Sequence, residues 1–215
     1  MIEFRECEQP GCRFRYPVMA GEHWRGRHCP RCGGPARQVE SVTPSQSEGS
    51  RSAQFHRLPV EGLLDNVRSV FNVGSIFRSA DGAGLRRLTL CGITPTPEHR
   101  KLAKTALGAE QAVAWEYHTN GVNAAMALRR LGHPLWCIEE GELSHSLFDC
   151  RPPVDGQALI LVVGHELAGV DPGIRRLADA VVAIPMAGVK RSLNVAVAFA
   201  VAAYFVAAAA RQPAS

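Results

Sequence analysis

The chain has 215 residues, of which 46% are apolar, and this length and composition predict one or two domains of an ordinary globular protein. The net charge of +4 is too small to indicate a polyanionic partner, but 21 of the 24 basic residues are arginine, which favours bidentate contacts with phosphate or carboxylate. The first eight residues are polar and lack the apolar segment of a secretory signal, so we expect a cytoplasmic protein with reduced cysteines.

Four cysteines near the N-terminus have the spacing of a metal site. Cys7 and Cys12 are separated by four residues, and Cys29 and Cys32 by two, in a C-P-R-C-G-G turn whose glycines let two sulfur atoms face one ion. Residues 1–37 hold too few aliphatic side chains for a core of their own, and structural zinc supplies about 10 kcal/mol or more of folding free energy. The spacing predicts a zinc-ribbon-like domain over residues 1–37, with a redox pair at Cys29 and Cys32 as the alternative.

The arginines of this segment leave two roles open. Five of its seven arginines lie among or beside the cysteines, namely Arg13, Arg15, Arg25, Arg27 and Arg31. They can dock the domain on nucleic acid or can simply be solvated, because the glutamates of residues 1–57 and four zinc-bound thiolates nearly cancel their charge.

Residues 38–56 are rich in serine, glutamine, proline and glycine, which predicts a flexible linker. Residues 57–211 then form one domain of ordinary size.

Short apolar runs alternate with helical patterns in this second domain. We expect strands at residues 87–91, 134–138, 158–163 and 180–184, and helices at residues 73–83, 99–106, 122–131 and 193–210. Residues 158–163 are apolar on both faces, as buried parallel strands are. The alternation predicts an α/β domain with a mainly parallel sheet. Residues 193–210 contain nine alanines, which favours a buried or dimer-facing helix over a membrane span.

Three glycine-containing stretches carry polar residues between these elements. They are residues 66–84, 161–170 and 184–198. In the first, we expect Asn72 to cap the helix, Gly74 to allow close approach of a neighbouring segment, and Arg78 to point away from the apolar face. The second reads as a buried strand that ends in glycines, where open α/β sheets bind ligands. The third is again a strand, a glycine-containing loop and a helix.

The order of these stretches is specific. N-x-G-x-x-x-R, then G-x-E-x-x-G, then I-P-M-x-G-x-x-x-S-L-N-V resembles the three motifs of the SpoU (TrmH) family of RNA ribose 2′-O-methyltransferases, in the SPOUT superfamily. The resemblance covers most of residues 60–205 and extends to Lys104-Thr-Ala-Leu-Gly-Ala-Glu110; His165 stands where the family often has asparagine or serine. It implies S-adenosylmethionine as methyl donor, tRNA or rRNA as substrate, a trefoil knot in the C-terminal half of the sheet, and a homodimer with its active site at the interface.

The resemblance also implies roles for individual residues. We expect a reaction centre made of Asn72, Arg78, Glu166, Ser192 and Asn194. We expect the donor to be surrounded by Gly164, Glu166, Ile184, Met186 and Leu193. The guanidinium fork of Arg78 can hold a phosphate and the 2′-hydroxyl together, and since the pKa of arginine lies above about 12, electrostatic positioning is favoured over proton abstraction. A non-catalytic zinc-ribbon RNA-binding protein on the same scaffold is the alternative function.

Overall fold

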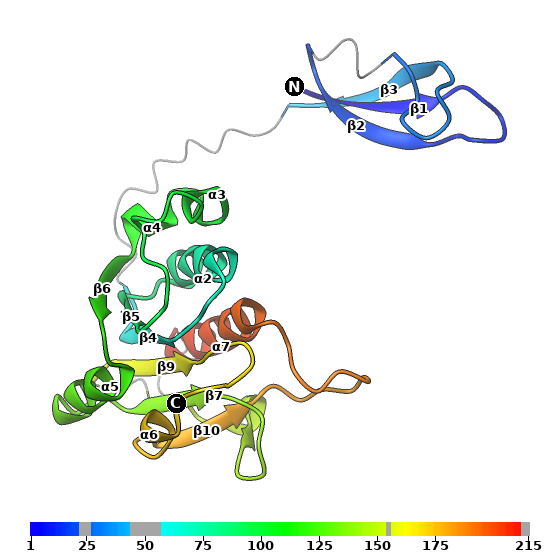
Figure 1. The fold of residues 1–215 in the computed structure, drawn as a ribbon. Helices are drawn as coiled ribbons and strands as arrows, with labels where there is room; N and C mark the ends of the chain where they lie inside the picture. Colours follow the sequence, from blue (N-terminus) through cyan, green and yellow to red (C-terminus); the bar gives the residue numbers. More distant parts are fainter. Residues whose placement is uncertain (22–26, 44–56, 154–155, 212–215) are drawn as a thin grey trace. The chain divides into compact units, whose positions relative to one another are not determined.

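The computed structural model describes residues 1–21, 27–43, 57–153 and 156–211. The chain divides into two compact units, Met1–Gln54 and Phe55–Ser215, and each is described by itself (Figure 1). Among the described residues, the structure contains no helix that could span a lipid bilayer.

The N-terminal unit is a three-stranded antiparallel sheet in the order β2-β1-β3. Its strands are β1 (Ile2–Cys7), β2 (Arg15–Met19) and β3 (Ala36–Val42). The domain boundary predicted after residue 37 is wrong, because β3 continues to Val42 and residues 38–42 belong to the sheet. The side chains of residues 38–42 are all exposed and three of the five are polar, which is why this segment resembled a linker. Residues 44–56 of the predicted linker lie outside the described residues.

The second unit is built on a seven-stranded sheet in which every neighbouring pair of strands runs parallel. In the order β6-β5-β4-β9-β7-β10-β8, the strands are β6 (Ala114–His118), β5 (Arg87–Cys91), β4 (Val60–Asp65), β9 (Leu159–Val163), β7 (Leu135–Ile138), β10 (Ala180–Ala183) and β8 (His145–Ser146). The predicted α/β class with a mainly parallel sheet is therefore confirmed. The central strand β9 is buried along its whole length, as its apolar sequence predicted.

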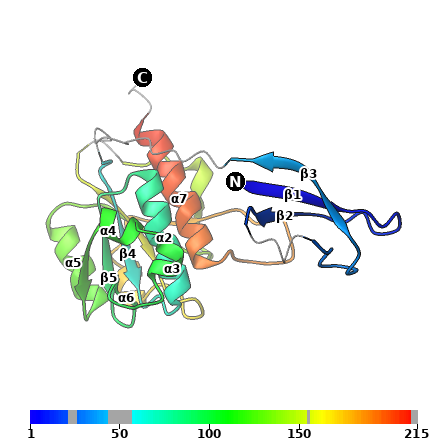
Figure 2. The ribbon, with the colours of Figure 1, turned by 90° about the horizontal axis from the view of Figure 1, so that it is seen from above.

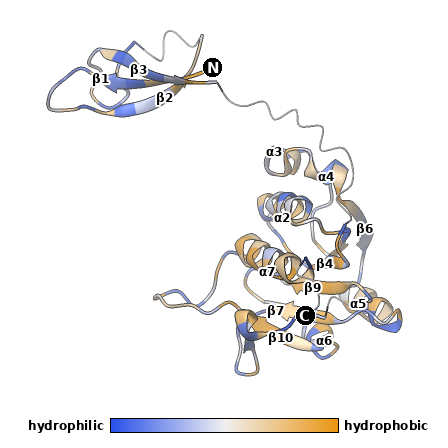
Figure 3. Cartoon of the chain, turned by 180° about the vertical axis from the view of Figure 1, so that it is seen from behind, coloured by the Kyte–Doolittle hydropathy of each residue, from blue (hydrophilic) through white to orange (hydrophobic). Residues whose placement is uncertain are grey.

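Helices cover both faces of the sheet (Figures 1 and 2). One face carries α2 (Val70–Ala83), α3 (Ala103–Ala106), α4 (Ala109–Ala112) and α7 (Val195–Ala210), and the other carries α5 (Gly121–Arg130) and α6 (Pro172–Arg175). A short 3-10 turn, Leu147–Asp149, follows β8. Buried apolar side chains form one cluster on each face of the sheet. Figure 3 shows that apolar residues are concentrated in β9 and along α7.

Some elements differ from those expected from the sequence. The helix expected at residues 99–106 is shortened to α3, which Leu107 ends with a φ of 52°. Strand β4 was not predicted, because Glu61 and Gly62 interrupt its apolar pattern. Strand β6 was not predicted either, since it lies at the edge of the sheet and carries Glu116 and His118. In both cases hydrogen bonding to a neighbouring strand forms the element, and the local sequence does not encode it.

Candidate active site

A cleft of about 430 Å³ opens at the carboxyl ends of β7, β9 and β10. Its apolar walls are formed by Ile138, Val163, Ile184 and Leu193, and its polar walls by the turn that follows β9 and by residues 191–194. Volumes of about 300–1,000 Å³ are usual for pockets that hold small molecules. Cleft-lining positions are therefore drawn from both the second and the third sequence motif.

Gly164 allows the turn after β9 to fold back over the end of that strand. A Cβ atom at Gly164 would lie 2.2 Å from the backbone of Gly169, which is too close for any other residue. The turn is closed by two backbone hydrogen bonds between His165 and Gly169, of 3.0 and 2.8 Å. Nδ1 of His165 also accepts from the N–H groups of Leu167 and Ala168, at 3.1 and 3.2 Å. Asparagine or serine oxygen can accept the same bonds, so histidine is a chemical equivalent at this position.

Glu166 joins this turn to the N-terminus of α2. Its Oε1 accepts from the Ser69 N–H and from the side-chain amide of Asn72, both at 2.9 Å, and its Oε2 accepts from the Arg68 N–H at 3.0 Å. Burial acts to raise the pKa of Glu166, but the N–H groups of Ser69 and Arg68 outweigh burial and lower the pKa below its ordinary value of 4.5. An ionised carboxylate at a helix N-terminus is also favoured by the helix dipole. Glu166 is therefore bound as an anion that clamps two loops together.

Asn72 extends this contact to the third motif. Its side-chain Oδ1 accepts from Nδ2 of Asn194 at 3.1 Å, and Oδ1 of Asn194 accepts from the Ala196 N–H at 2.9 Å, which caps α7. The expectation that Asn72 caps α2 is wrong: the cap is Ser69, whose Oγ accepts from the Asn72 N–H at 3.4 Å. Asn72 lies in the first turn, where its side chain bridges Glu166 and Asn194. Residues far apart in the sequence thus form one polar cluster.

Gly74 fixes the segment between the first and second motifs against α2. A Cβ atom at Gly74 would lie 2.0 Å from Oγ1 of Thr105 and 2.8 Å from the carbonyl oxygen of Leu102. The close approach expected at Gly74 is confirmed. It holds α3, which carries Lys104, directly on the second turn of α2.

The other residues expected at the site lie in three places. Four of them line the cleft, namely Gly164, Ile184, Ser192 and Leu193. Met186 is half-buried in the loop after β10 and is not part of the cleft wall in the described structure. Arg78 lies on α2 six residues after Asn72, on a different side of the helix, and is exposed with no ion pair among the described residues. This chain therefore does not bring Arg78 to the Asn72–Glu166–Asn194 cluster.

Two acidic residues at or near the site were not among those expected from the sequence. Asp65 is buried at the end of β4, where its carboxylate accepts from Nδ2 of Asn66 at 2.8 Å and from the Asp171 N–H at 2.9 Å, and burial raises its pKa. Glu139 follows β7 and lines the cleft. The sequence signal that could have indicated Asp65 is the polar pair Asp65-Asn66 at the end of an apolar strand. This signal could be used only if β4 had been predicted as a strand.

The charge of the cleft is predominantly negative. Three carboxylates line it, from Glu139, Glu140 and Glu166, against one lining arginine, Arg191, whose side chain is 90% exposed and lies 4.0 Å from Glu140; Glu139 also lies 3.7 Å from Arg175, outside the lining. A ligand with an apolar part and a positive charge therefore matches this cleft best.

The four cysteines predicted as ligands lie together in the N-terminal unit. Their Sγ atoms are all within 4.8 Å of one another, with 3.5 Å between Cys7 and Cys32 and 3.8 Å between Cys12 and Cys29. Sulfur atoms at about 2.3 Å from a tetrahedral zinc ion are about 3.8 Å apart. The donor set and its spacing therefore fit a four-thiolate zinc site.

Comparison with known proteins establishes the family. Residues 61–204, well over half of the chain, match the model of the SpoU rRNA Methylase family. The chain belongs to the SpoU family. It is 36% identical over 171 residues to the 23S rRNA (guanosine-2′-O-)-methyltransferase RlmB of Burkholderia sp. This alignment covers 74% of this chain and 66% of the relative's length. The chain is 31% identical over 144 residues to RlmB of Vibrio parahaemolyticus, covering 66% of this chain and 56% of the relative's length.

Solved structures of SpoU proteins have the same fold. The AdoMet-bound rRNA methyltransferase from Sinorhizobium meliloti superimposes with a TM-score of 0.63 at 27% identity, covering 68% of this chain and 54% of that one. The TrmH/SpoU tRNA modifying enzyme of A. aeolicus gives a TM-score of 0.61 at 27% identity, covering 70% and 75%. The resemblance found in the sequence motifs is thus confirmed at the level of the family.

Proposed function

We propose that this SpoU protein is an S-adenosylmethionine-dependent methyltransferase that modifies a ribose 2′-hydroxyl of rRNA or tRNA in the cytoplasm. The observation that carries the proposal is the Asn72–Glu166–Asn194 cluster, which joins all three family motifs beside a negatively charged cleft. A non-catalytic RNA-binding protein has no need of such a cluster. The names of the similar proteins support both rRNA and tRNA as substrate classes.

The cleft suits S-adenosylmethionine, which supplies an electrophilic methyl group when bound. Apolar side chains such as Ile184 and Leu193 match the adenine ring, and the cleft carboxylates match the positive charge of the sulfonium. Backbone groups around Gly164 and Glu166 can bind the polar edge of the donor. Met186, in the loop after β10, would contribute an apolar contact.

The protein's own residues then orient the nucleophile. The hydrogen bonds among Glu166, Asn72 and Asn194 hold three elements in fixed relative positions: the turn after β9, helix α2 and helix α7. Ser192 lies two residues before Asn194 and lines the cleft, so the same hydrogen bonds keep it at the cleft. The guanidinium of Arg78 would hold the neighbouring phosphate and the 2′-oxygen in one fork and stabilise the negative charge that develops as the hydroxyl proton leaves to water.

A homodimer would bring Arg78 to the reaction centre. The outward face of α7 carries exposed apolar side chains, with Val197 49% and Tyr204 51% exposed. On α2, Phe71 is 51% exposed and lies about two helical turns before Arg78. The two helices pack together at Gly82, where a Cβ atom would lie 2.5 Å from the hydroxyl of Tyr204. Such a surface is too apolar to leave exposed. A second copy covering it would place Arg78 of one chain beside the cluster of the other.

Subunit complementation tests this arrangement. Arg78→Ala and Asn194→Ala chains, each inactive alone, are co-expressed with different tags, and the mixed dimers are isolated. If Arg78 acts on the other subunit, each mixed dimer has one intact centre, so purified mixed dimers recover about half of the wild-type rate. Mixed dimers as inactive as either parent would show that both residues act within one chain, and a monomer by light scattering would refute the assembly itself.

The activity is tested by transfer of labelled methyl groups from S-adenosylmethionine to total RNA from cells that lack the gene. The expected result is label in rRNA or tRNA at a single 2′-O-methyl position, together with donor binding by calorimetry. Donor binding without transfer to any RNA would contradict the proposed substrate. Absence of donor binding would favour the non-catalytic alternative.

We also propose that Cys7, Cys12, Cys29 and Cys32 hold one structural zinc ion. The site is closed by four thiolates, so its role is folding of the N-terminal unit. Elemental analysis should give one zinc per chain. A chelator should unfold this unit while donor binding is retained, and metal-free protein purified under reducing conditions with an intact ribbon would contradict the site.

The trefoil knot of the family is proposed for the C-terminal half of the sheet. Strand β10 pairs with both β7 and β8, which follow one another in the sequence, so β10 lies within the span bridged by residues 139–144. This arrangement supports threading of the chain through that loop. An experimental structure that traces residues 135–195 without a crossing would contradict the knot.

A further inference from the structure

The described arginines of the N-terminal unit fall into two groups. Three have an acidic partner: Arg5 pairs with Glu3, Arg13 with Glu6, and Arg15 with Glu40. Arg15 is also held over the ring of Phe4, at 5.9 Å. Arg37 lies directly across from Glu6 in the sheet. Arg27, Arg31 and Arg37 have no ion pair within the described ranges, and of these three only Arg27 and Arg31 border the Cys29–Cys32 turn, since Arg37 lies on β3.

An aromatic pair lies beside the segment that carries these two arginines. Phe14 and Tyr16 stack with their ring centroids 5.9 Å apart and their planes 22° from parallel. The hydroxyl of Tyr16 donates to the carbonyl oxygen of His28 at 3.0 Å, which fixes the rings next to the Cys29–Cys32 turn. Tyr16 is only 8% exposed, whereas Phe14 is 38% exposed. Phe14 is thus a supported ring with an open side.

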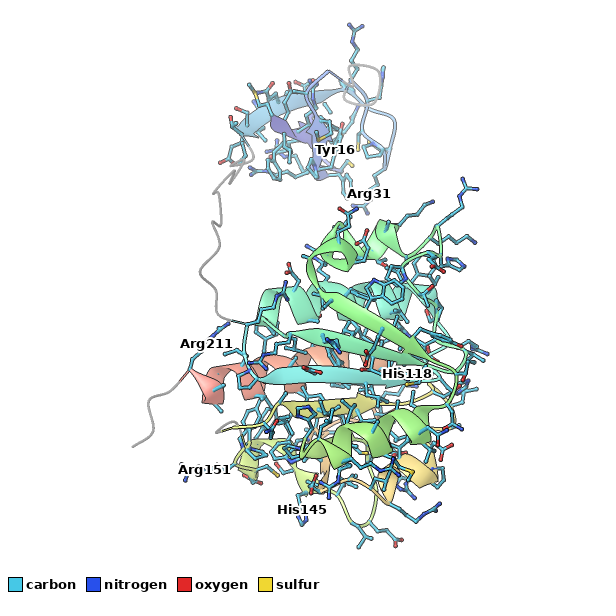
Figure 4. All side chains as sticks on the ribbon, turned by 90° about the vertical axis from the view of Figure 1, so that its left-hand side faces the viewer. Tyr16, Arg31, His118, His145, Arg151 and Arg211 are labelled. Atoms are coloured by element: carbon cyan, nitrogen blue, oxygen red, sulfur yellow. The ribbon has the colours of Figure 1, made fainter. Side chains whose placement is uncertain are left out.

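The position of Arg31 is fixed by the cysteine turn. Its backbone N–H donates to Sγ of Cys29 at 3.4 Å, so its backbone is held while its side chain extends into solvent (Figure 4). Arg27 lies just before this turn, where its carbonyl oxygen accepts from the Ala36 N–H at 3.2 Å. Arg27 and Arg31 therefore lie on either side of His28 and Cys29, in the segment that the Tyr16 hydroxyl binds, on a backbone that is hydrogen-bonded on both sides of the turn.

The charge of this surface argues for short-range contacts. Four thiolates on one zinc ion carry a net charge of −2, which offsets the two arginines, so diffuse attraction to a polyanion is weak. Guanidinium forks bind individual phosphates bidentately, and an open aromatic ring stacks on any base. The stacking contact needs an accessible base face, and placing phosphates on either side of the stacked base needs a flexible backbone. Single-stranded RNA offers them, whereas a duplex hides its base faces.

We propose that Phe14, Arg27 and Arg31, with Tyr16 and His28 as support, form a binding surface for single-stranded RNA. A base stacks on the open side of Phe14, and Arg27 and Arg31 hold phosphates on either side of it. The inference rests on the proposed function, since it gives the N-terminal unit the task of binding the RNA that the second unit methylates.

The test uses full-length, zinc-loaded protein and a fluorescent oligouridylate of about ten nucleotides. Phe14→Leu should weaken binding by about 5- to 100-fold, the range for loss of one stacked base, and Phe14→Tyr should bind as the wild type does. Arg31→Gln should lower the slope of log Kd against log salt by about 0.7, the value for one phosphate contact with a single strand. Zinc content and donor affinity should stay unchanged in every variant.

The matched control is Arg15→Gln, which removes the same charge from the same sheet at a side chain already held by Glu40 and Phe4. It should leave RNA binding unchanged. The proposal is overturned if Arg31→Gln and Phe14→Leu bind like the wild type, if Arg15→Gln weakens binding equally, or if duplex RNA competes as well as the single strand. Methyl transfer by the wild type is measured in parallel, so a failure of the ribbon surface is distinguished from a failure of the enzymatic function.

Discussion

Replacing Glu166 by glutamine is expected to loosen the junction of the three motifs. The carboxylate accepts three hydrogen bonds at 2.9–3.0 Å, and an amide in its place can keep those to Ser69 and Asn72 but turns its NH₂ group toward the Arg68 N–H. One charge-assisted hydrogen bond, of about 1.5–3 kcal/mol, is lost, and so is an anion at a helix N-terminus, of about 0.3–1 kcal/mol. Because Glu166 is half-exposed, the lower ends of both ranges apply, and the expected loss of unfolding free energy is about 2 kcal/mol.

Urea and thermal denaturation of the full chain measure this loss. About 2 kcal/mol corresponds to a fall in Tm of about 4–8 °C for a domain of this size. Glu142→Gln, which removes a charge from an exposed loop, should change stability by less than about 0.5 kcal/mol. The pKa of Glu166 is lowered by folding, so the contribution is present above pH 4.5 and is lost as the pH falls through the folded-state pKa. A difference below about 0.5 kcal/mol at pH 7, or one that persists in acid, would refute the reasoning.

Three further outcomes are expected. Gly74→Ala should destabilise the second unit by about 1–3 kcal/mol, because the added Cβ overlaps the backbone at the start of α3. Gly141→Ala, whose Cβ would have no atom within 4 Å, should leave the stability unchanged. Equal effects of the two substitutions in denaturation would contradict the close packing at Gly74. His165→Asn should bind the donor nearly as the wild type does in calorimetry. His165→Ala should bind it several-fold more weakly, because the N–H groups of Leu167 and Ala168 lose their acceptor. The same affinity in both variants would show that accepting these two hydrogen bonds does not contribute to donor binding. Arg78→Ala should lower single-turnover methyl transfer by about 10²- to 10⁴-fold with donor affinity unchanged, and Arg78→Lys should also fail; more than about a tenth of the wild-type rate in Arg78→Ala would contradict its electrostatic role.

The sequence determined the family and the chemical groups of the site. The N-x-G-x-x-x-R, G-x-E-x-x-G and I-P-M-x-G-x-x-x-S-L-N-V motifs depend on residue type and spacing, which are readable without a fold, and so do the four cysteines. Strands such as Leu159–Val163 were also readable, because burial on both faces requires an unbroken apolar run. Gly74 was correctly expected at a close approach, since a missing side chain leaves room for a neighbour.

Only the tertiary structure decided how these groups meet. Whether Asn72 caps its helix or bridges to Glu166 depends on a turn 94 residues away, which no local pattern encodes, and Ser69 took the capping role instead. Strand β4, on which Asp65 is buried, is defined by its pairing with β5 and β9 and by the burial of Val60, Leu63 and Leu64 in the core, and both depend on the rest of the fold. The difference between Arg15 and Arg31 likewise depends on long-range contacts: Glu40, 25 residues from Arg15 in the sequence, pairs with Arg15, whereas Arg31 has no ion pair among the described residues. Local sequence specifies propensity and chemistry, whereas the partners of polar side chains are set by the fold.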